Sequence, residues 1–446
     1  MKSDGASDRR GLRILLIAYE FPPSPSPQSL RWAYLAGRLA AFGHELHVMA
    51  PDLAGDGQGL PDPAQGVCVH RVWPGPAAAL LGRLARRKRH DPAHCDPRPT
   101  SGGEDLFAGL GAIQPAYLNW KGRLLERVQD AASWLLFPDQ RGEWAWPARR
   151  ALPGLLSRIR PDVVITSHEP ATTLALGLEA RRRGFRWVAD LGDPVLAGYT
   201  PRRWRRRARR LEGRAMREAD HVLVTTTGTR ALLQERHPAG APITVVPQGF
   251  DESVAVAGSR PAGGRPVVLE LLYAGRFYPF RDPRPLVEGV LQVPGVRLNI
   301  ASVNAPDWLV RIVDRHPGQL RLLGGIPHQR LLVLQRQTDI LVNIANADPA
   351  QIPGKVFEYL GACRPILHLQ AQEGDAVCEL LAGLARGWSC MATAESVAGV
   401  LHRLVALAAD GRLEAALELD AGRVQAWSWT ALARKVENVL VSPASQ

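Results

Sequence analysis

Short runs of apolar residues recur along the chain, and most are followed by a segment with helical spacing. Leu12–Tyr19 is almost continuously apolar, as expected for a strand buried on both faces of a parallel sheet. In Leu30–Phe42 apolar residues recur every three or four positions, which predicts a helix, and Gly43 then stands where a left-handed helix cap belongs. HELHVMAP (His44–Pro51) predicts a second strand. These segments together predict a right-handed βαβ unit.

Further apolar runs predict two parallel sheets. The first series continues with PDVVITSH, FRWVADL, DHVLVTTT and ITVVPQG, and the second consists of VVLELLYAG, VRLNIAS, LRLLGGI, TDILVNI and RPILHL. Between them, residues 251–266 are rich in Gly, Ser, Ala and Pro and predict a linker. We therefore expect an α/β protein with two doubly wound, Rossmann-like domains that face each other across a cleft.

The domain boundaries follow from this pattern. We assign residues 1–250 to an N-terminal domain, residues 267–425 to a C-terminal domain and residues 426–446 to a final helical segment. Residues 74–146 form an insertion that holds the basic stretch RLARRKRH and an amphipathic helix predicted over Tyr117–Phe137.

Charge and cysteine usage narrow the class of protein. At 446 residues the chain is long enough for two cores, and its net charge of +12 favours an anionic partner. The five cysteines form no C-x-x-C pair, which argues against a disulfide framework or a structural zinc and fits a reducing cytosol. The histidines lack ligand spacing, so no metal site is predicted. No apolar run reaches the ~18 residues of a membrane span, and we expect a cytoplasmic location.

Lys355 and Glu358 occupy the start of a predicted helix, Gly354–Gly361, with Pro353 suited to its first position. A helix N-terminus attracts phosphate, and Lys355 adds a full positive charge there. The Glu358 carboxylate suits a sugar diol such as that of ribose. Together the two side chains suit a nucleoside diphosphate. The alternative is a surface ion pair between them, which contributes only ~0.2–0.5 kcal/mol.

Gly275 and Arg276 follow a predicted strand directly, and Arg281 comes five residues later. Ligands of doubly wound folds bind at this end of the strands. Two arginines there suit a diphosphate, because guanidinium and phosphate pair in bidentate fashion. The chain contains no Asp-x-Asp sequence, so a metal–diphosphate clamp of that kind is not expected.

The order of these pieces resembles the family-four-type retaining glycosyltransferases of the GT-B fold over nearly the whole chain. The resemblance rests on RILLIAYEFPPSPSPQSLRWAYLAGRLAAFGHELHVMAP, WVADLGDP, ITVVPQGFD, LLYAGRF, IPHQRLLVLQRQTDILVNI, PGKVFEYLGACRPIL and WSWTALARKVENVL. It implies that Arg276 and Arg281 hold the diphosphate of a nucleoside-diphosphate sugar, that Glu358 holds the ribose, and that Lys355 lies near the phosphates or the sugar. It also implies retention of configuration, no cofactor, a glycan or polyprenyl-linked acceptor in bacterial surface polysaccharide synthesis, and a last segment that returns to the N-terminal domain.

The chain departs from the family pattern at three places. Ala350 stands where a Glu-x₇-Glu signature needs its first glutamate, with Asp348 as a substitute, and Pro25–Ser29 replaces a glycine pair. Where many relatives carry a catalytic histidine, this chain reads ADLGDP, which resembles a subset with a D-x-x-D-P stretch. Asp190 and Asp193 of that stretch are candidates for orienting the acceptor or acting as a base. A cap or turn role is the alternative.

His168 also ends a predicted strand of the first domain. Its ordinary pKa of ~6.5 suits proton transfer near neutrality, which makes it the remaining candidate for a base. The alternative is a histidine that only orients the loop before Pro170.

The stretch PRRWRRRARRLEGRAMRE is the most basic segment of the chain. Three interpretations remain open for it: a solvated helix face, contact with an anionic membrane surface, and nucleic-acid binding. No nucleic-acid-binding module accompanies it, so nucleic acid is the least favoured partner. The residues concerned are Arg202, Arg203, Trp204, Arg205, Arg206, Arg207, Arg209 and Arg210.

Two other functions are compatible with the sequence. Asp52, after the second strand, stands where a dinucleotide-dependent oxidoreductase carries its ribose-binding acid, but the first turn, FPPSPSPQS, has no glycine for the dinucleotide fingerprint. The other alternative is a non-catalytic, basic membrane- or nucleic-acid-binding protein on a decayed transferase fold.

Overall fold

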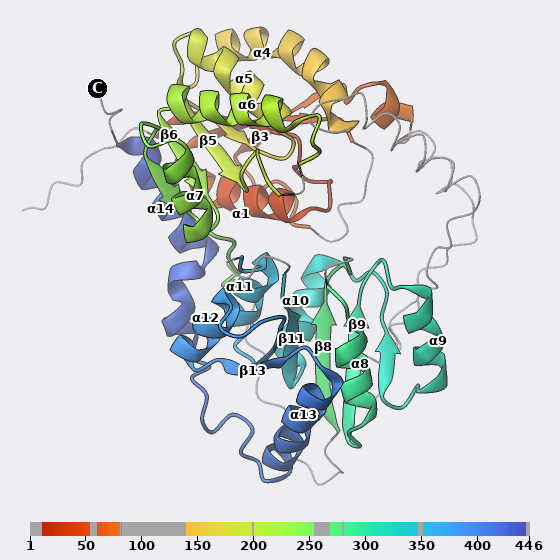
Figure 1. The fold of residues 1–446 in the computed structure, drawn as a ribbon. Helices are drawn as coiled ribbons and strands as arrows, with labels where there is room; N and C mark the ends of the chain where they lie inside the picture. Colours follow the sequence, from red (N-terminus) through yellow and green to blue (C-terminus); the bar gives the residue numbers. More distant parts are fainter. Residues whose placement is uncertain are drawn as a thin grey trace, which may run out of the picture. The chain divides into compact units, whose positions relative to one another are not determined.

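The fold is taken from a computed structural model, which describes residues 11–53, 60–80, 82, 140–198, 200–253, 268–278, 281–346 and 351–442. These residues form two compact units (Figure 1). The first contains the described residues up to Pro247 and those from Trp429 onward, and the second contains those of Gln248–Ser428. The boundary therefore lies three residues before the predicted one, and the last segment rejoins the first unit at Trp429.

The first unit is built on a seven-stranded sheet with the order β3-β2-β1-β4-β5-β6-β7, in which every pairing is parallel. Its strands are β1 (Arg13–Ala18), β2 (Glu45–Pro51), β3 (Val67–Val72), β4 (Val163–Ser167), β5 (Arg186–Gly192), β6 (His221–Val224) and β7 (Ile243–Val245). Its helices are α1 (Pro27–Ala41), α4 (Ala145–Ile159), α5 (Thr172–Arg182), α6 (Arg205–Glu218), α7 (Thr227–Arg236) and α14 (Trp429–Val441), with the 3-10 helix η2 (Gln140–Trp144).

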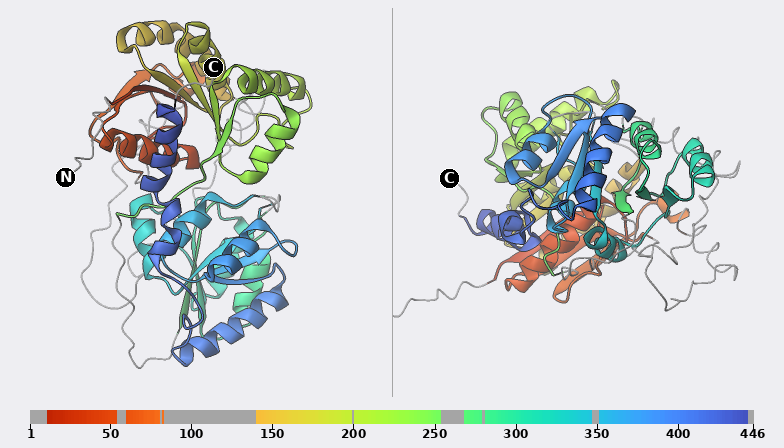
Figure 2. Two further views of the ribbon diagram at one scale, coloured as in Figure 1. Left: turned by 90° about the vertical axis from the view of Figure 1, so that its left-hand side faces the viewer. Right: turned by 90° about the horizontal axis from the view of Figure 1, so that it is seen from below.

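Alternate residues of β1 feed two apolar cores, one on each face of this sheet. Ile14 and Leu16 pack with α1 and α14, whereas Leu15 and Ile17 pack with α4 and α5. Such burial on both faces explains why the strand reads as a continuous apolar run. Helix α14 lies against α1, as the left view of Figure 2 shows, so residues from the end of the chain complete the core of the first unit.

The second unit repeats the design with a six-stranded parallel sheet of order β10-β9-β8-β11-β12-β13. Its strands are β8 (Leu269–Ala274), β9 (Val296–Ala301), β10 (Leu320–Leu322), β11 (Ile340–Ile344), β12 (Ile366–Gln370) and β13 (Gly387–Met391). Its helices are α8 (Arg284–Leu291), α9 (Asp307–Arg315), α10 (His328–Gln337), α11 (Gly354–Gly361), α12 (Ala376–Leu384) and α13 (Ala394–Ala409), with the 3-10 helix η3 (Ala421–Trp427). Leu271 and Tyr273 of β8 face α8 and α13, and Leu272 and Ala274 face α10, α11 and α12.

The predicted strands and the doubly wound topology are confirmed. Helix α1 begins three residues before the predicted start, because the Ser26 side chain caps it by accepting from the Ser29 N–H and Pro27 suits the first turn. Gly43 has the left-handed φ, +93°, that its place after this helix requires. Strands β3 and β13 were not predicted.

Several sequence predictions lie outside the described residues. These are the helix over residues 117–137, the basic stretch of residues 83–90, positions 348 and 350, and most of the linker. Within the described part of the chain, no helix combines the length and apolar character needed to cross a membrane.

Candidate functional site

The nucleotide-binding residues predicted for the second unit lie where its strand order reverses. Strand β8 has β9 on one side and β11 on the other, so the connections that leave the carboxyl ends of β8 and β11 run in opposite directions along the sheet. Crevices that bind ligands form at such positions. Gly275 directly follows β8, and α11 follows β11. The fold therefore brings Gly275 and Lys355 to the same place.

Lys355 points at the turn after β8. Its Nζ lies 4.1 Å from the centre of the Tyr273 ring and 5.8 Å from that of Tyr359. Gly275 has a φ of +142°, which L side chains rarely adopt, and a Cβ there would lie 3.8 Å from Lys355 Nζ. The backbone conformation of this turn therefore favours glycine, and the turn passes within van der Waals distance of the lysine head group.

The ammonium of Lys355 is buried and has no hydrogen-bond partner among the described residues. Burial, and secondarily the charge of Arg281, hold its pKa well below the ordinary lysine value. The predicted alternative, an ion pair between Lys355 and Glu358, is wrong, because the Lys355 Nζ makes no such contact. The ring faces of Tyr273 and Tyr359 lie close enough to the ammonium for favourable cation–π contacts.

Arg281 lies beside this lysine and is only 8% exposed. One terminal nitrogen donates to Oδ1 of Asn346, at the end of β11, and the guanidinium lies 5.4 Å from the Tyr278 ring centre. Its Nε has no hydrogen-bond partner among the described residues. Among the described residues no carboxylate bonds to either of these two cations, an arrangement that suits an anion with several oxygens.

Arg276 differs from Arg281 in being exposed. Its backbone is held, since its carbonyl accepts from the Tyr273 hydroxyl at 3.3 Å and the next N–H donates to Asn304 Oδ1 at 2.9 Å. Its guanidinium makes no hydrogen bond or ion pair within the part of the chain that the structure describes. The side chain is therefore available to a ligand while its base is fixed.

Glu358 lies one turn along α11 from Lys355. Its carboxylate oxygens are 3.5 Å from Gln335 Nε2 and 3.7 Å from His328 Nε2, both on α10. These are long contacts, so the carboxylate keeps capacity to accept further hydrogen bonds. The helix spans the predicted residues, but Pro353 occupies the position before its first residue rather than the first position itself.

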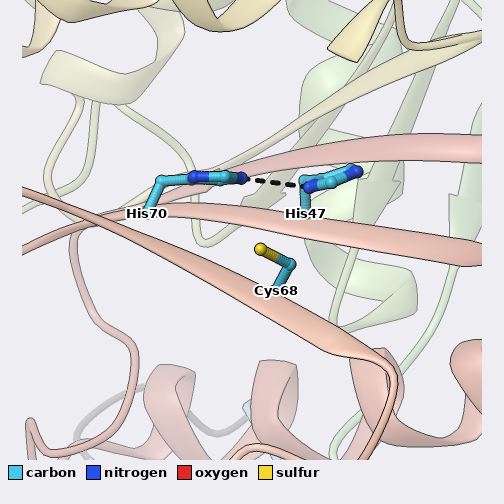
Figure 3. A group of neighbouring side chains, drawn as sticks. All are labelled: His47, Cys68 and His70. Atoms are coloured by element: carbon cyan, nitrogen blue, oxygen red, sulfur yellow. Dashed lines mark hydrogen bonds between the residues drawn. The ribbon is translucent and has the colours of Figure 1, made fainter. Parts of the chain in front are cut away.

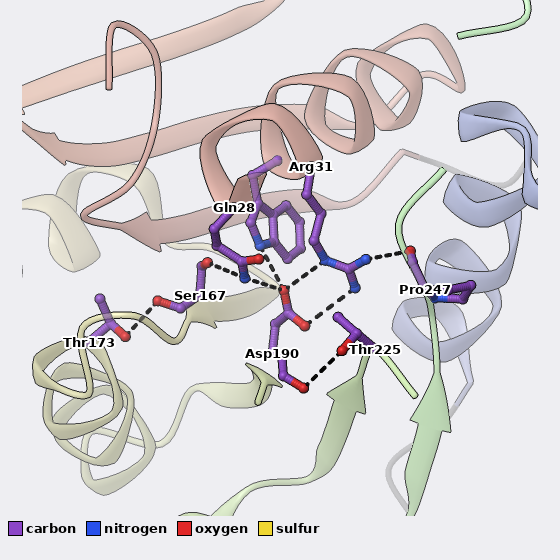
Figure 4. A network of polar contacts seen from close by, with 9 residues as sticks. Gln28, Arg31, Ser167, Thr173, Asp190, Thr225 and Pro247 are labelled. Carbon is purple, nitrogen blue, oxygen red and sulfur yellow. Dashed lines mark hydrogen bonds and ion pairs between the residues drawn. The ribbon is translucent and has the colours of Figure 1, made fainter. Parts of the chain in front are cut away.

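Asp190, at the end of β5 in the first unit, is fully buried and saturated with hydrogen bonds (Figure 4). Its carboxylate accepts from Trp32 Nε1 at 2.8 Å, from Gln28 Nε2 at 3.2 Å and from Arg31 Nε at 3.2 Å. Arg31 also donates to the Pro247 carbonyl at 2.7 Å. This geometry makes Asp190 a residue that ties β5 to α1, because no oxygen faces an open space.

His168 follows β4, and its backbone N–H donates to the Asp190 carbonyl at 2.7 Å. The ring is buried, and Nδ1 has no partner among the described residues. Burial lowers its pKa to about 4, so the imidazole is neutral near pH 7 and is a weak base there. Asp193, beyond β5, is half-buried and takes part in other polar contacts.

The prediction missed the partners of Asp190. Gln28, Arg31 and Trp32 are spaced three and four residues apart on α1, so they share one face, and Gln28 also donates to Ser167 Oγ at 2.9 Å. An arginine on the buried face of a helix is the signal that could have pointed to this network. It requires a buried acid as partner.

Residues 111–254 match the family model described as Glycosyltransferase Family 4. Among curated proteins, D-inositol 3-phosphate glycosyltransferase of Mycolicibacterium smegmatis is 28% identical over 202 residues, 43% of either chain. The same-named protein of Mycobacterium ulcerans is 28% identical over 154 residues, 32% of either chain. The aligned part thus spans less than half the length of these relatives.

Solved structures match over almost the whole chain. Sucrose-phosphate synthase from Thermosynechococcus elongatus has a TM-score of 0.63 and 16% identity, with 96% of this chain and 98% of that chain covered. Anabaena HepE, solved with UDP and glucose, has a TM-score of 0.61 and 13% identity, with 97% and 100% covered. This chain has the GT-B glycosyltransferase fold. These matches support the resemblance to the family-four-type enzymes. The basic residues Arg276, Arg281 and Lys355 lie in the second Rossmann-like unit of this GT-B protein.

Proposed function

We propose that this protein is a retaining, metal-independent glycosyltransferase. It moves a sugar from a nucleoside-diphosphate sugar to a hydroxyl of a glycan or polyprenyl-linked acceptor, in bacterial surface polysaccharide synthesis. No cofactor takes part in this reaction. The donor binds in the second unit, at the carboxyl ends of β8 and β11.

The observation that carries the proposal is the unpartnered ammonium of Lys355, buried beside Gly275 and Arg281. A buried cation without a partner lowers the stability of the protein. Its presence therefore favours a ligand that supplies the missing hydrogen-bond acceptors. A diphosphate supplies the missing negative charge, and Arg276 is free to close on it from the exposed side. Glu358 then accepts from the ribose hydroxyls.

Two structural neighbours support a nucleotide sugar as the donor. HepE was solved with UDP and glucose, and an Escherichia coli protein described as trehalose-6-phosphate, at a TM-score of 0.58, 13% identity and 96% and 98% coverage, was solved with UDP-2-fluoro glucose. Those ligands belong to those proteins. For this chain they motivate testing uridine nucleotides first.

The proposed chemistry needs charge stabilisation more than proton transfer. The acceptor oxygen bonds to the anomeric carbon on the face from which the diphosphate leaves, and the leaving oxygen keeps the electrons of the broken bond. Arg276, Arg281, Lys355 and the α11 N-terminus stabilise that negative charge. The hydroxyl proton passes to the departing diphosphate or to a base, for which Asp193 and His168 are the candidates, because Asp190 is saturated.

A thermal-shift screen tests the class of function. UDP- and GDP-sugars, NAD(P) and a generic polyanion are compared at equal concentration. A rise in Tm with one sugar nucleotide favours the transferase, whereas a response to NAD(P) alone favours an oxidoreductase. A response to neither the sugar nucleotides nor NAD(P) favours the non-catalytic binder.

Arg276→Ala then tests the assigned site. We expect release of the nucleoside diphosphate from the identified donor to fall by about 100-fold or more, the cost of removing one preorganised charge-stabilising donor. Arg311→Ala, which removes an exposed arginine of α9, is the matched control and keeps normal turnover. Near-normal turnover by Arg276→Ala, with an unchanged Tm, rejects the assignment.

The acceptor side of the proposal includes contact with an anionic membrane. All seven arginines of residues 202–210 are exposed. The guanidinium groups of Arg203 and Arg207 lie within 6 Å of the centre of the Trp204 ring. A tryptophan among cations suits a membrane interface, and a polyprenyl-linked acceptor would be found there. A solvated helix face and nucleic-acid contact are the alternatives, and sedimentation with anionic liposomes separates the membrane surface from the solvated face.

A further inference from the structure

His47, Cys68 and His70 come together on two neighbouring strands of the first unit (Figure 3). The parallel register of β2 and β3 places His47 opposite Cys68. His70 follows Cys68 by two residues on β3, so both side chains lie on the same face of the sheet. The cluster lies at the edge of the sheet, because β3 is its outermost strand.

The ligand atoms are already close enough to share an ion. The imidazole nitrogens and the Cys68 sulfur all lie within 4.8 Å of one another, and His47 Nδ1 is 3.0 Å from His70 Nε2. Nitrogens bound to tetrahedral Zn²⁺ at 2.0–2.1 Å stand ~3.3 Å apart. A few tenths of an ångström of movement therefore separates the two rings from coordination geometry.

The Glu45 carboxylate contacts the imidazole nitrogen of His47 that faces away from the other two ligands. Glu45, two residues before His47 on the same strand, lies 2.8 Å from its Nε2. Such a contact fixes the proton on Nε2 and leaves the Nδ1 lone pair directed at the other ligands. The same carboxylate–histidine–metal arrangement recurs in zinc proteins.

We propose that His47 Nδ1, His70 Nε2 and the Cys68 thiolate bind one Zn²⁺ ion, with water in an open fourth position. Two imidazoles and a thiolate are ligands that zinc prefers over calcium or magnesium. The thiol gives its proton to solvent when the sulfur binds. Cys68 is exposed, so the ion exchanges with solution, and its binding fastens edge strand β3 to β2.

Arg158 of α4 opposes the ion and supplies an internal test. Its terminal nitrogen is 3.4 Å from His70 Nδ1. Coordination through Nε2 places a proton on Nδ1, which removes this contact, and the guanidinium charge repels a dication. Loss of Arg158 therefore strengthens zinc binding, whereas loss of a residue that merely packs nearby has no such effect.

Cobalt and zinc titrations of the full chain test the site. Co²⁺ is expected to bind at one equivalent, with a thiolate charge-transfer band in the near ultraviolet and the visible bands of a tetrahedral ion. Zn²⁺ then displaces it. Cys68→Ser is expected to remove the charge-transfer band, and His70→Asn to weaken Zn²⁺ binding at least ~100-fold, as the loss of a direct ligand should exceed the 10–100-fold of an outer partner.

Matched variants exclude binding by any accessible thiol or by an altered fold. Cys378→Ser, at a half-buried thiol of α12, keeps the wild-type spectrum, Arg158→Ala tightens Zn²⁺ binding, and all variants keep the metal-free Tm. The proposal is overturned if the wild type binds no Co²⁺ at micromolar concentration, if the charge-transfer band persists in Cys68→Ser, or if it disappears in Cys378→Ser. In those cases the two imidazoles form only a hydrogen-bonded pair.

Discussion

At the scale of single residues, Lys355 combines a stability cost with the binding role proposed for it. Its ammonium is buried, lies near Arg281 and has no hydrogen-bond partner among the described residues. Leaving a polar group unsatisfied in the interior costs about 1–3 kcal/mol in mutational data. Sites that bind charged ligands often retain such local destabilisation.

Lys355→Met is expected to raise the stability of the free protein by about 1–3 kcal/mol and to abolish the Tm response to the donor. Methionine keeps the length of the chain and removes the charge. Because burial depresses the lysine pKa, the wild type loses stability relative to the variant as the pH falls below the ordinary lysine value. Denaturant unfolding with and without donor measures both effects.

Lys435→Met, at an exposed lysine of α14, is the control, and it should change neither the stability nor the donor response. A destabilised Lys355→Met that still responds to donor contradicts this account.

His168 predicts a pH dependence of stability. Its pKa is lowered by burial from 6.5 to about 4, so the unfolded chain takes up a proton before the folded one does. The associated stability is complete above pH 6.5, falls as the pH drops toward 4 and is constant below that, a loss of roughly 3 kcal/mol at most. His168→Phe should lack this component. Between pH 7 and 4 the wild type should therefore lose up to roughly 3 kcal/mol of unfolding free energy relative to the variant, and parallel curves contradict the prediction.

The chemistry of both sites was only partly readable from residue types. Lys355 and Arg281 were recognisable as phosphate-binding candidates because they follow strand ends. The hydrogen bonds that Asp190 accepts from Arg31, Gln28 and Trp32 were not recognisable, because those partners lie some 160 positions away in sequence. Local spacing carries no information about a buried pair between two separate elements.

At the scale of elements, α6 separates a packing face from a charged face. Ala208, Ala215 and Met216 are buried, and the buried Glu212 accepts from the Leu196 N–H at 2.9 Å and lies 3.1 Å from His237 Nε2. The helix is thus anchored, and its arginines project outward as a fixed set of charges.

Replacing Arg206, Arg209 and Arg210 by glutamine should weaken binding to anionic liposomes about 100-fold, since each basic residue at such a surface contributes about 1 kcal/mol. Co-sedimentation at low and high salt measures this, with neutral liposomes as reference. Replacing Arg311, Arg315 and Arg330 of the second unit makes the same charge change and should leave sedimentation unaltered. Equal losses in both triple variants indicate a general charge effect, and no sedimentation of the wild type returns α6 to solvent.

Strand β3 shows why some elements escaped prediction. Its residues VCVHRV are half-buried or exposed, because β3 forms the edge of the sheet. Continuous apolar runs predict central strands such as β1, because both faces of such a strand are buried. An edge strand has fewer buried neighbours, so its sequence need not be apolar. Missing β3 also hid the His47–Cys68–His70 cluster, although a Cys-x-His spacing on a strand would have placed two of its members on one face.

At the scale of the whole molecule, the first unit is assembled from two distant parts of the chain. Trp429, at the start of α14, is 1% exposed and stacks on Tyr34 of α1 with ring centres 5.4 Å apart. Arg186 of β5 donates to the carbonyl of Val439 at 2.8 Å. The GT-B topology was predictable because the strand series is long and regular, and the return of the last helix was implied by family resemblance alone.

Trp429→Ala should cost about 3–5 kcal/mol, as expected for deleting a buried tryptophan. Hydrogen exchange should speed up in peptides of β1, α1 and β4 and remain unchanged in β8, β11 and α11. Trp146→Ala removes a tryptophan of α4 that is 65% exposed and serves as the control in the same unit. Faster exchange throughout both units would show that the two do not unfold separately.

The return of α14 also constrains the order of events during synthesis. A ribosome that has produced residues 11–247 has made every strand of the first sheet, yet Trp429, Leu432 and Val436 of its core have not been translated. The nascent first unit therefore waits with an uncovered apolar face beside α1 while some 180 further residues emerge. Chaperones that hold exposed apolar surface would meet this chain at that stage, before its second half has been completed.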